Sequence, residues 1–167
     1  MRFTVLLALI LSMIAPTYAH AQGCDSAEAR QLDFWLGEWD LTWSGGSGTN
    51  DITRRFGDCV IEENFSGDMP AGKYFGHSVS VWNPRKGKWQ QTWVDSQGGY
   101  LQFTGGVGED GMMRLFGEPA QIPDGRTQHT RMSWLNVETD SFDWHWERSF
   151  DGGETWEMVW LIHYKRR

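Results

Sequence analysis

The stretch DFWLGEWD, residues 33–40, joins the only helical segment that the sequence predicts to the first of a long series of strands. Before it, residues 25–36 favour a short helix, because Asp25 or Ser26 can cap the first turn. After it, polar and apolar residues alternate and the breaks fall at glycine and proline, which is typical of β-strands. The rest of the chain is therefore expected to be β structure.

Ten short strands with hairpin-length connections are predicted. No helical period is long enough to connect parallel strands, so the sheet is expected to be antiparallel and to form a barrel or a sandwich. The sequence has no internal repeat and no linker, which favours a single domain. The strands are expected near residues 37–44, 50–56, 59–66, 74–82, 87–95, 99–105, 111–117, 128–137, 141–150 and 155–165.

The second and third of these strands place two charged residues on an apolar face. A two-residue turn at residues 57–58 would set Arg54 opposite Ile61 and Ile52 opposite Glu63. Charged side chains on an inward face are costly unless they pair with each other or with a ligand. Three interpretations remain open. Arg54 and Glu63 form an ion pair, or this face of the two strands points outward and not inward, or both side chains contact a ligand.

The late segment SFDGGETW, residues 149–156, fits the S-x-D-x-G-x-T-W pattern of the Asp box found in sialidases and other secreted glycosidases. In those enzymes the box is a repeated hairpin feature of a propeller and lies away from the catalytic centre. A single copy in a short chain therefore predicts a turn held by Asp151, not glycosidase activity. An odd loop over 151–155 would bring the tryptophan-rich faces of both flanking strands to the same side. That shared face is expected to carry Phe142, Trp144, Trp146, Arg148, Trp156, Met158, Trp160, Ile162 and Tyr164.

The segment Gly37-Glu38-Trp39 resembles the G-x-W signature of lipocalins, which begins the first strand just after a short helical turn. In lipocalins the tryptophan closes one end of the barrel, and a basic residue near the end of the last strand covers it. The resemblance implies the first role for Trp39. It implies the second role for Lys165, Arg166 or Arg167.

The chain after residue 21 also resembles an uncharacterised, mostly bacterial protein family. Its members share a D-F-W-x-G-x-W-like opening, a W-x-Q-x-W-x-D segment (here residues 89–95, with an extra glutamine) and a late S-x-D-G-G-x-T-W hairpin. That family has no established common activity, so the resemblance indicates a fold and not a function. The fold is all-β: a single antiparallel calycin-like β-barrel of about ten strands with a short N-terminal helix, akin to lipocalins, fatty-acid-binding proteins and nitrobindin-type haem proteins.

Residues 1–21 have the composition of a secretory signal peptide: a basic start, an apolar run over 5–14 and an A-x-A site at 19–21. Cleavage after Ala21 would leave a single β-barrel domain over 22–167. No other stretch approaches transmembrane length. The net charge of −7 without a basic cluster disfavours nucleic acid and anionic membranes as partners. We therefore expect a secreted or periplasmic protein, either a monomer or a homodimer.

The sequence contains two cysteines, Cys24 and Cys59. In an exported chain this number predicts one disulfide bond. The alternative is a lipid anchor on Cys24, because residues 21–24 resemble a lipoprotein cleavage site. Lipidation would leave Cys59 unpaired.

Eleven tryptophans are more than a core of this size needs. Barrels of this class can enclose one small molecule, so we expect a tryptophan-lined cavity for a small hydrophobic or aromatic ligand. Arginine forks at the wall would suit a ligand carboxylate. The alternative is a solid core, with the arginines extending to the rim. The expected ligand-binding residues are Trp43, Arg54, Glu63, Trp89, Gln91, Trp93, Arg131, Trp144, Trp146, Arg148 and Trp160.

No cofactor and no metal are expected. The histidines after residue 21 show none of the spacings typical of metal sites. Haem is the alternative, with His163 near the end of the last strand as the iron ligand. However, the alternation of that strand puts His163 opposite the tryptophan face.

Catalytic signals are weak. The sequence has no G-x-S-x-G elbow and no free thiol with a histidine partner. Carboxylates are numerous, but nothing in the sequence pairs two of them across a cleft. We therefore expect an exported, non-enzymatic small-molecule-binding protein. One alternative is an enzyme that uses the same cavity, for isomerase or cyclase chemistry with Glu63 as acid or base, or for glycan hydrolysis. Another is a structural cell-envelope protein without a ligand.

Overall fold

The computed structural model describes residues 24–167, and the predicted signal peptide over 1–21 lies outside them. Two short 3₁₀ turns, η1 (Glu28–Arg30) and η2 (Asp33–Trp35), precede the strands. The helix predicted over 25–36 is therefore two separate turns. Leu32 separates them, because its dihedral angles (φ −101°, ψ 12°) depart from helical geometry.

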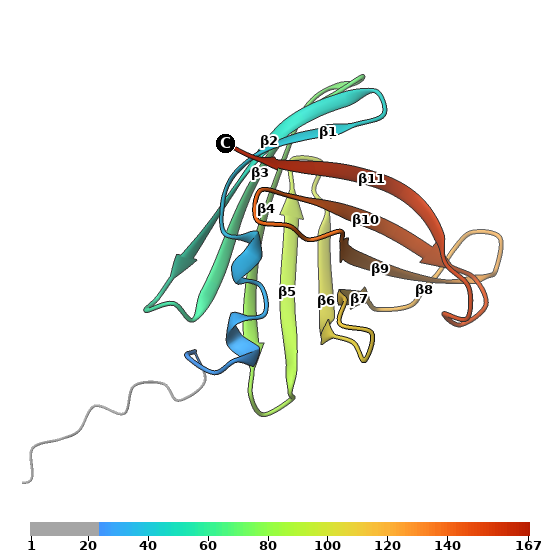
Figure 1. Ribbon diagram of the computed structural model, residues 1–167. Coiled ribbons are helices and arrows are strands. Elements are labelled where there is room, and N and C mark those ends of the chain that lie inside the picture. The colour runs from blue at the N-terminus through green and yellow to red at the C-terminus, as the bar shows by residue number, and fades with distance from the viewer. Residues whose placement is uncertain (1–23) are drawn as a thin grey trace, which may run out of the picture.

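Ten strands form a closed antiparallel barrel, as the calycin-like fold predicts (Figure 1). Neighbours in sequence pair with one another, β7 pairs with β9, and β11 pairs with both β10 and β1, which closes the barrel. The predicted strands correspond to β1–β7 and β9–β11, and the two-residue β8 beside β9 was not predicted. The strands are β1 (Gly37–Trp43), β2 (Gly46–Arg55), β3 (Val60–Met69), β4 (Gly72–Asn83), β5 (Lys88–Asp95), β6 (Tyr100–Val107), β7 (Met113–Gly117), β8 (Ala120–Gln121), β9 (Thr127–Leu135), β10 (Ser141–Ser149) and β11 (Glu157–Arg166).

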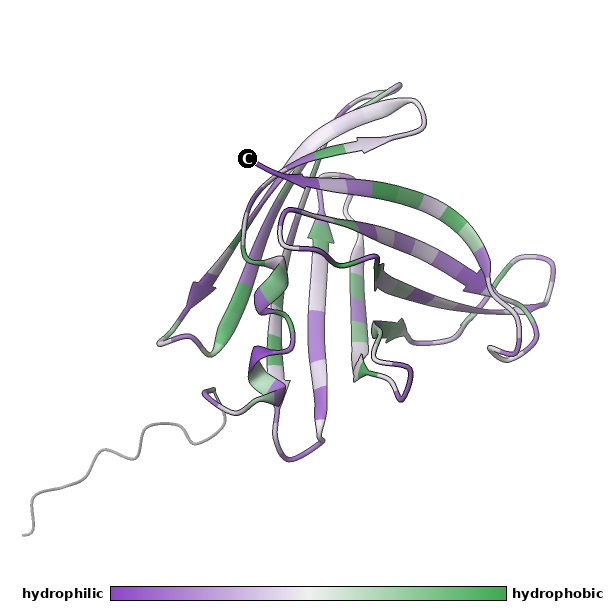
Figure 2. Ribbon diagram, viewed as in Figure 1, coloured by the Kyte–Doolittle hydropathy of each residue, from purple (hydrophilic) through white to green (hydrophobic). Residues whose placement is uncertain are grey.

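Alternating burial along the strands separates the interior of the barrel from its surface. In β3, for example, every second residue from Ile61 to Gly67 is buried, because successive side chains point to opposite faces. Figure 2 shows bands of hydrophilic and hydrophobic residues succeeding one another along the strands. The inward residues form one continuous core.

The end of the barrel next to the 3₁₀ turns is closed by Trp39 and Arg166. Trp39 is fully buried, and its indole Nε1–H donates to the carbonyl of Trp35 over 2.8 Å. The Arg166 guanidinium lies 4.1 Å from the centroid of the Trp39 ring and donates to the carbonyl of Leu36 over 2.8 Å. Of the three basic residues considered for this position, Arg166 is the one that covers the tryptophan.

The pairing of β2 with β3 has the predicted register: Arg54 lies opposite Ile61, and Ile52 lies opposite Glu63. The face of Glu63 is inward, since Ile52, Ile61 and Glu63 are all buried. The interpretation of Arg54 and Glu63 as an ion pair is wrong. Arg54 stands near the end of β2 beside the 3₁₀ turns, where its guanidinium pairs with the carboxylate of Asp33.

A disulfide bond joins Cys24, before η1, to Cys59, just before β3. The bond indicates an oxidising compartment, extracellular or periplasmic. It also uses the Cys24 sulfur that a lipid anchor would need, so the lipidation alternative is not compatible with this pairing. Within residues 24–167, no helix has both the length and the apolar composition needed to span a membrane.

The Asp box forms the turn between β10 and β11, as predicted. A carboxylate oxygen of Asp151 accepts hydrogen bonds from the backbone N–H of Thr155 (3.0 Å) and the hydroxyl of Ser149 (2.7 Å). The Ser149 hydroxyl oxygen in turn accepts from the N–H of Gly153 over 2.9 Å. Gly152 and Gly153 have positive φ angles of 77° and 93°, which glycine adopts without steric cost.

The prediction of a shared tryptophan face for this hairpin is confirmed away from the turn. Near the turn the prediction is wrong. Trp146 pairs with Trp160, but Glu147 pairs with Met158, so Val159 is an extra residue that forms a β-bulge. The bulge reverses the alternation of β11. Met158 is therefore 51% exposed instead of facing the interior.

Candidate ligand-binding site

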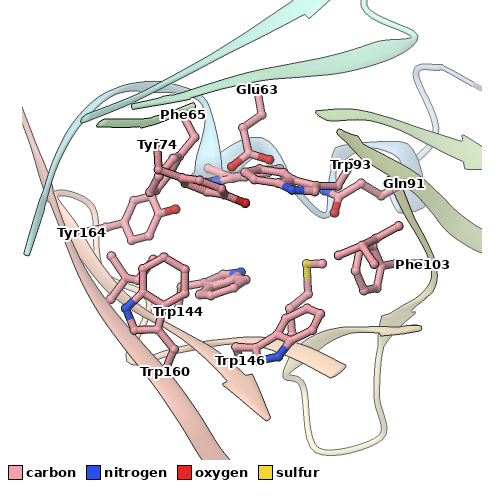
Figure 3. A pocket seen from close by; sticks show the side chains of 14 residues that line it. Glu63, Phe65, Tyr74, Gln91, Trp93, Phe103, Trp144, Trp146, Trp160 and Tyr164 are labelled. Atoms are coloured by element: carbon pink, nitrogen blue, oxygen red, sulfur yellow. The ribbon is translucent and has the colours of Figure 1, made fainter. Parts of the chain in front are cut away.

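A cavity of about 180 Å³ lies inside the barrel (Figure 3). An engineered cavity of about 150 Å³ holds a benzene molecule, so this volume suits one small ring-containing compound. Most of the wall is aromatic, and the few polar groups come from β3, β4, β5 and β11. The lining residues are Trp35, Glu63, Phe65, Tyr74, Gln91, Trp93, Leu101, Phe103, Met132, Trp144, Trp146, Trp160, Ile162 and Tyr164.

Part of the predicted site meets at this cavity. The barrel is not filled by its tryptophans, because a cavity remains between the rings of Trp93, Trp144, Trp146 and Trp160. The strand alternation places the predicted residues of β3, β5, β10 and β11 on the inner wall. The lining residues that were predicted are Glu63, Gln91, Trp93, Trp144, Trp146 and Trp160.

Two predicted tryptophans face the interior but do not line the cavity. Trp89 is buried at the closed end, where its ring packs against Trp82 and its Nε1–H donates to the side chain of Gln31 over 3.2 Å. Trp43, at the other end of the barrel, packs against the ring of Trp160 with centroids 5.4 Å apart. Both side chains point into the barrel, as predicted. However, neither lies at the height of the cavity along the barrel axis.

Arg131 was expected to be a polar anchor of the site, and this prediction is wrong. Its neighbour Met132 lines the cavity, so Arg131 lies on the outer surface of β9. There its guanidinium donates two hydrogen bonds to the Glu147 carboxylate, at 2.7 and 2.9 Å. The ring of Trp156 covers it from 4.1 Å.

The remaining two arginines are also absent from the cavity wall. Arg54 pairs with Asp33 at the closed end. Arg148 pairs with Glu157 over 2.9 Å beside the Asp-box turn. The bulge in β11 sets Glu157 opposite Arg148. The expected arginine fork for a ligand carboxylate is therefore not part of this cavity.

Glu63 is the acidic group of the cavity wall. Its carboxylate accepts hydrogen bonds from the Ser78 hydroxyl (2.5 Å) and from the Asn50 side-chain amide (2.7 Å). Asn50 also donates to the Tyr164 hydroxyl over 3.1 Å. Burial raises the pKa of Glu63 to about 7, although both hydrogen bonds act to lower it.

Asp95 holds two aromatic rings of the wall in place. One carboxylate oxygen accepts from the Tyr74 hydroxyl (3.0 Å) and from the Trp93 indole N–H (3.2 Å). The other oxygen accepts from the backbone N–H of Gly99 (2.9 Å), and this bond contributes most to a lowered pKa of Asp95. The pKa of Tyr74 is raised to about 12, mainly by burial and also by its bond to Asp95.

Small residues on the inner face of β4 leave room for the side chains of β3 and β5 that line the cavity. Gly76, Ser78 and Ser80 alternate along this strand and are all buried. Ser80 accepts a hydrogen bond from the Gln91 amide over 2.9 Å, which orients a polar group of the wall. This G-x-S-x-S alternation is visible in the sequence and is the signal that would have indicated a hollow interior at this level.

Other lining residues were not predicted as part of the site. Tyr164 lies two residues beyond Ile162 on the predicted tryptophan face of β11, so its position followed from the alternation. No sequence pattern marked Trp35, or Asn50, which binds the Glu63 carboxylate behind the cavity wall. The positions of both depend on how the barrel closes. The unpredicted lining residues are Trp35, Phe65, Tyr74, Leu101, Phe103, Met132, Ile162 and Tyr164.

The histidine considered for haem and the carboxylic acids other than Glu63 lie outside the cavity lining. His163 is exposed on the outer face, as its alternation predicted, and bonds to Asp143 over 2.6 Å. Among the lining residues Glu63 is the single carboxylic acid, whereas glycoside hydrolysis uses two. In the described part of the chain no three histidine, cysteine or acidic side chains are grouped so that they could hold a metal ion.

The fold and site together define a closed antiparallel β-barrel with an aromatic internal cavity and one buried acid. Comparison of the sequence with protein-family models and with curated proteins found no match. The chemistry of the cavity therefore carries the functional proposal.

Proposed function

We propose that this protein is an exported binding protein that holds one small aromatic or largely apolar molecule inside its barrel. The observation that carries the proposal is the cavity of about 180 Å³ walled by Trp93, Trp144, Trp146 and Trp160. Large flat rings provide contact area for another ring, and burial of apolar ligand surface contributes roughly 25 cal/mol per Å².

The arrangement of the rings favours binding without a large rearrangement. Trp144 stacks on Trp146 at a centroid distance of 6.2 Å and meets Trp160 edge-on at 5.9 Å. Trp93 is held by its hydrogen bond to Asp95. A pocket whose walls already support one another loses little conformational entropy when the ligand enters.

Export is supported by two independent features. The composition of residues 1–21 is that of a secretory signal peptide. The Cys24–Cys59 disulfide is of the kind that forms and persists in an oxidising compartment.

Tryptophan fluorescence of the disulfide-bonded protein tests the proposal. Indole, benzyl alcohol and a naphthol are titrated into the protein, and we expect a saturable change with at least one of them. Trp146→Ala removes a lining ring and should weaken binding by tenfold or more. Trp156→Ala is the matched control: it removes a ring of the same kind from the outer surface, where Trp156 covers Arg131, and should leave the affinity unchanged. Absence of saturable binding, or equal losses in the two variants, would contradict the proposal.

A second candidate is an enzyme in which Glu63 acts as a general acid or base. The specific observation in its favour is a cavity-lining carboxyl whose pKa is raised by burial to about 7, the range suited to proton transfer at neutral pH. An identified ligand would be incubated with the native protein and with Glu63→Gln, and the products followed by NMR. Turnover by the native protein but not by a variant that still binds the ligand would favour catalysis over simple binding.

A further inference from the structure

Glu63 is buried without a positive partner. The residue is only 6% exposed, and the two groups that donate hydrogen bonds to its carboxylate, from Ser78 and Asn50, are both uncharged. No arginine, lysine or histidine is among the cavity-lining residues of the described chain. Buried charges in proteins are normally paired, so an ionised carboxylate here lacks the counter-charge that would offset its desolvation.

Aromatic side chains surround the space in front of this carboxyl group. Figure 3 shows the Glu63 carboxyl directed into the cavity, with Trp144 and Trp146 across from it. The face of an aromatic ring is negative and attracts cations, most strongly in tryptophan and after desolvation. A carboxylate opposite a group of indole rings is a combination that favours a positive group between them.

A second carboxylate stands behind the rings of Tyr74 and Trp93. Asp95 bonds to both of them, and its lowered pKa means that it is ionised at neutral pH. The whole chain carries a net charge of −7. Negative charge of this kind attracts cations and repels anions as they approach the protein.

We infer that the natural ligand is a small aromatic amine: its ammonium group pairs with the Glu63 carboxylate, and its ring lies among Trp93, Trp144 and Trp146. The inference rests on the proposed binding function and specifies its ligand class. It also replaces the expectation of a carboxylate ligand, since the arginines that would have bound one lie outside the cavity.

The titration of Glu63 makes amine binding dependent on pH. The titratable groups that face it are the phenols of Tyr74 from β4 and Tyr164 from β11, with Asp95 of β5 behind Tyr74. Burial raises the pKa of both phenols, so they remain neutral at physiological pH. In the empty cavity the pKa of Glu63 is raised to about 7, so an ammonium ligand must displace a proton from it at lower pH.

The experiment compares 2-phenylethylamine with 2-phenylethanol, which has the same ring and chain but no charge. Affinities are measured by calorimetry on the disulfide-bonded protein at pH 8 and pH 5.5. At pH 8 we expect the amine to bind at least tenfold more tightly than the alcohol. Between pH 8 and 5.5 the amine affinity should fall by about 30-fold, because the ionised fraction of a group with a pKa near 7 falls by that factor. The alcohol affinity should stay constant.

Glu63→Gln should abolish both the preference for the amine over the alcohol and the pH dependence of amine binding. Glu62→Gln is the matched control: Glu62 is the adjacent carboxylate, and it pairs with Arg55 outside the cavity. It should keep both properties.

The outcomes separate the inference from the function on which it rests. If the alcohol binds as tightly as the amine, or if Glu63→Gln keeps the preference for the amine, the amine inference is wrong and the binding function stands. Tighter binding of phenylacetate than of the amine also overturns the inference. If none of these compounds and none of the neutral aromatic probes binds, the proposed function fails as well.

Discussion

The indole ring of Trp93 lies directly over Gly76 on the neighbouring strand. A Cβ atom added at Gly76 would be 2.0 Å from two carbons of that ring. Glycine at this position therefore allows a large aromatic side chain to lie flat against the wall of the cavity.

We expect Gly76→Ala to push the Trp93 ring into the cavity and so to weaken ligand binding by at least tenfold. Crowding of this kind in a packed interior costs roughly 1–3 kcal/mol of stability. Urea unfolding and ligand titration measure the two effects. Gly106→Ala in β6 is the control, because an added Cβ there meets nothing within 4 Å. Similar behaviour of both variants would show that Trp93 adapts without cost.

The Arg166 guanidinium stabilises the closed end of the barrel. It covers the Trp39 ring and donates to backbone carbonyls of the segment that leads into β1. We expect Arg166→Leu to lower the free energy of unfolding by about 2–3 kcal/mol, since it removes a cation–π contact and charge-assisted hydrogen bonds. Arg167→Leu breaks only an exposed pair with Asp40 and should cost less than about 1 kcal/mol. Equal midpoints in chemical denaturation would contradict this role.

Burial of Glu63 makes the empty protein less stable at high pH. Its pKa is raised in the folded protein to about 7, so its protonated form favours the folded state. The resulting stability is fully present below the unfolded pKa, near 4.5, and is lost as the pH rises through 7. The loss is on the order of 3 kcal/mol. Glu63→Gln lacks this titration, so the unfolding free energies of variant and native protein should diverge between pH 5 and pH 8. Parallel pH profiles would exclude a buried titration at this position.

The Asp151 carboxylate stabilises the turn between β10 and β11. We expect Asp151→Ala to lower the urea midpoint, because the N–H of Thr155 and the hydroxyl of Ser149 both lose their acceptor. Glu154→Ala, an exposed carboxylate in the same turn, is the control and should have little effect. Hydrogen bonding to Thr155 lowers the pKa of Asp151, so the native protein should lose this contribution only in strong acid. A variant as stable as the control would show that the turn does not depend on the Asp151 carboxylate.

The sequence predicted most of the fold because its signals are local. Alternation of period two identified the ten barrel strands, and the turn predicted at residues 57–58 gave the register in which Ile52 lies opposite Glu63, although the turn in the structure spans residues 56–59. The Asp-box pattern predicted that Asp151 would hold the turn, and its carboxylate accepts the N–H of Thr155. Each of these features depends on a few neighbouring residues and on elementary backbone geometry.

The site was predicted less completely, since a cavity depends on groups far apart in sequence. Trp89 faces inward as expected, yet it lies below the cavity at the closed end. The bulge at Val159 reversed the expected facing of Met158. Alternation within one strand indicates a face, but it does not give the height of a residue along the barrel axis or the position of a bulge.

The sequence by itself thus predicted the ten barrel strands, the disulfide pair and the register that sets Ile52 opposite Glu63. Only the tertiary structure decided that Arg54, Arg131 and Arg148 pair outside the cavity and leave Glu63 as its acidic group. The physical reason is that each arginine meets its carboxylate partner on another strand or turn, between 9 and 21 residues away in the sequence. Those pairings depend on the register between elements and on the bulge in β11, which alternation within a single strand does not encode.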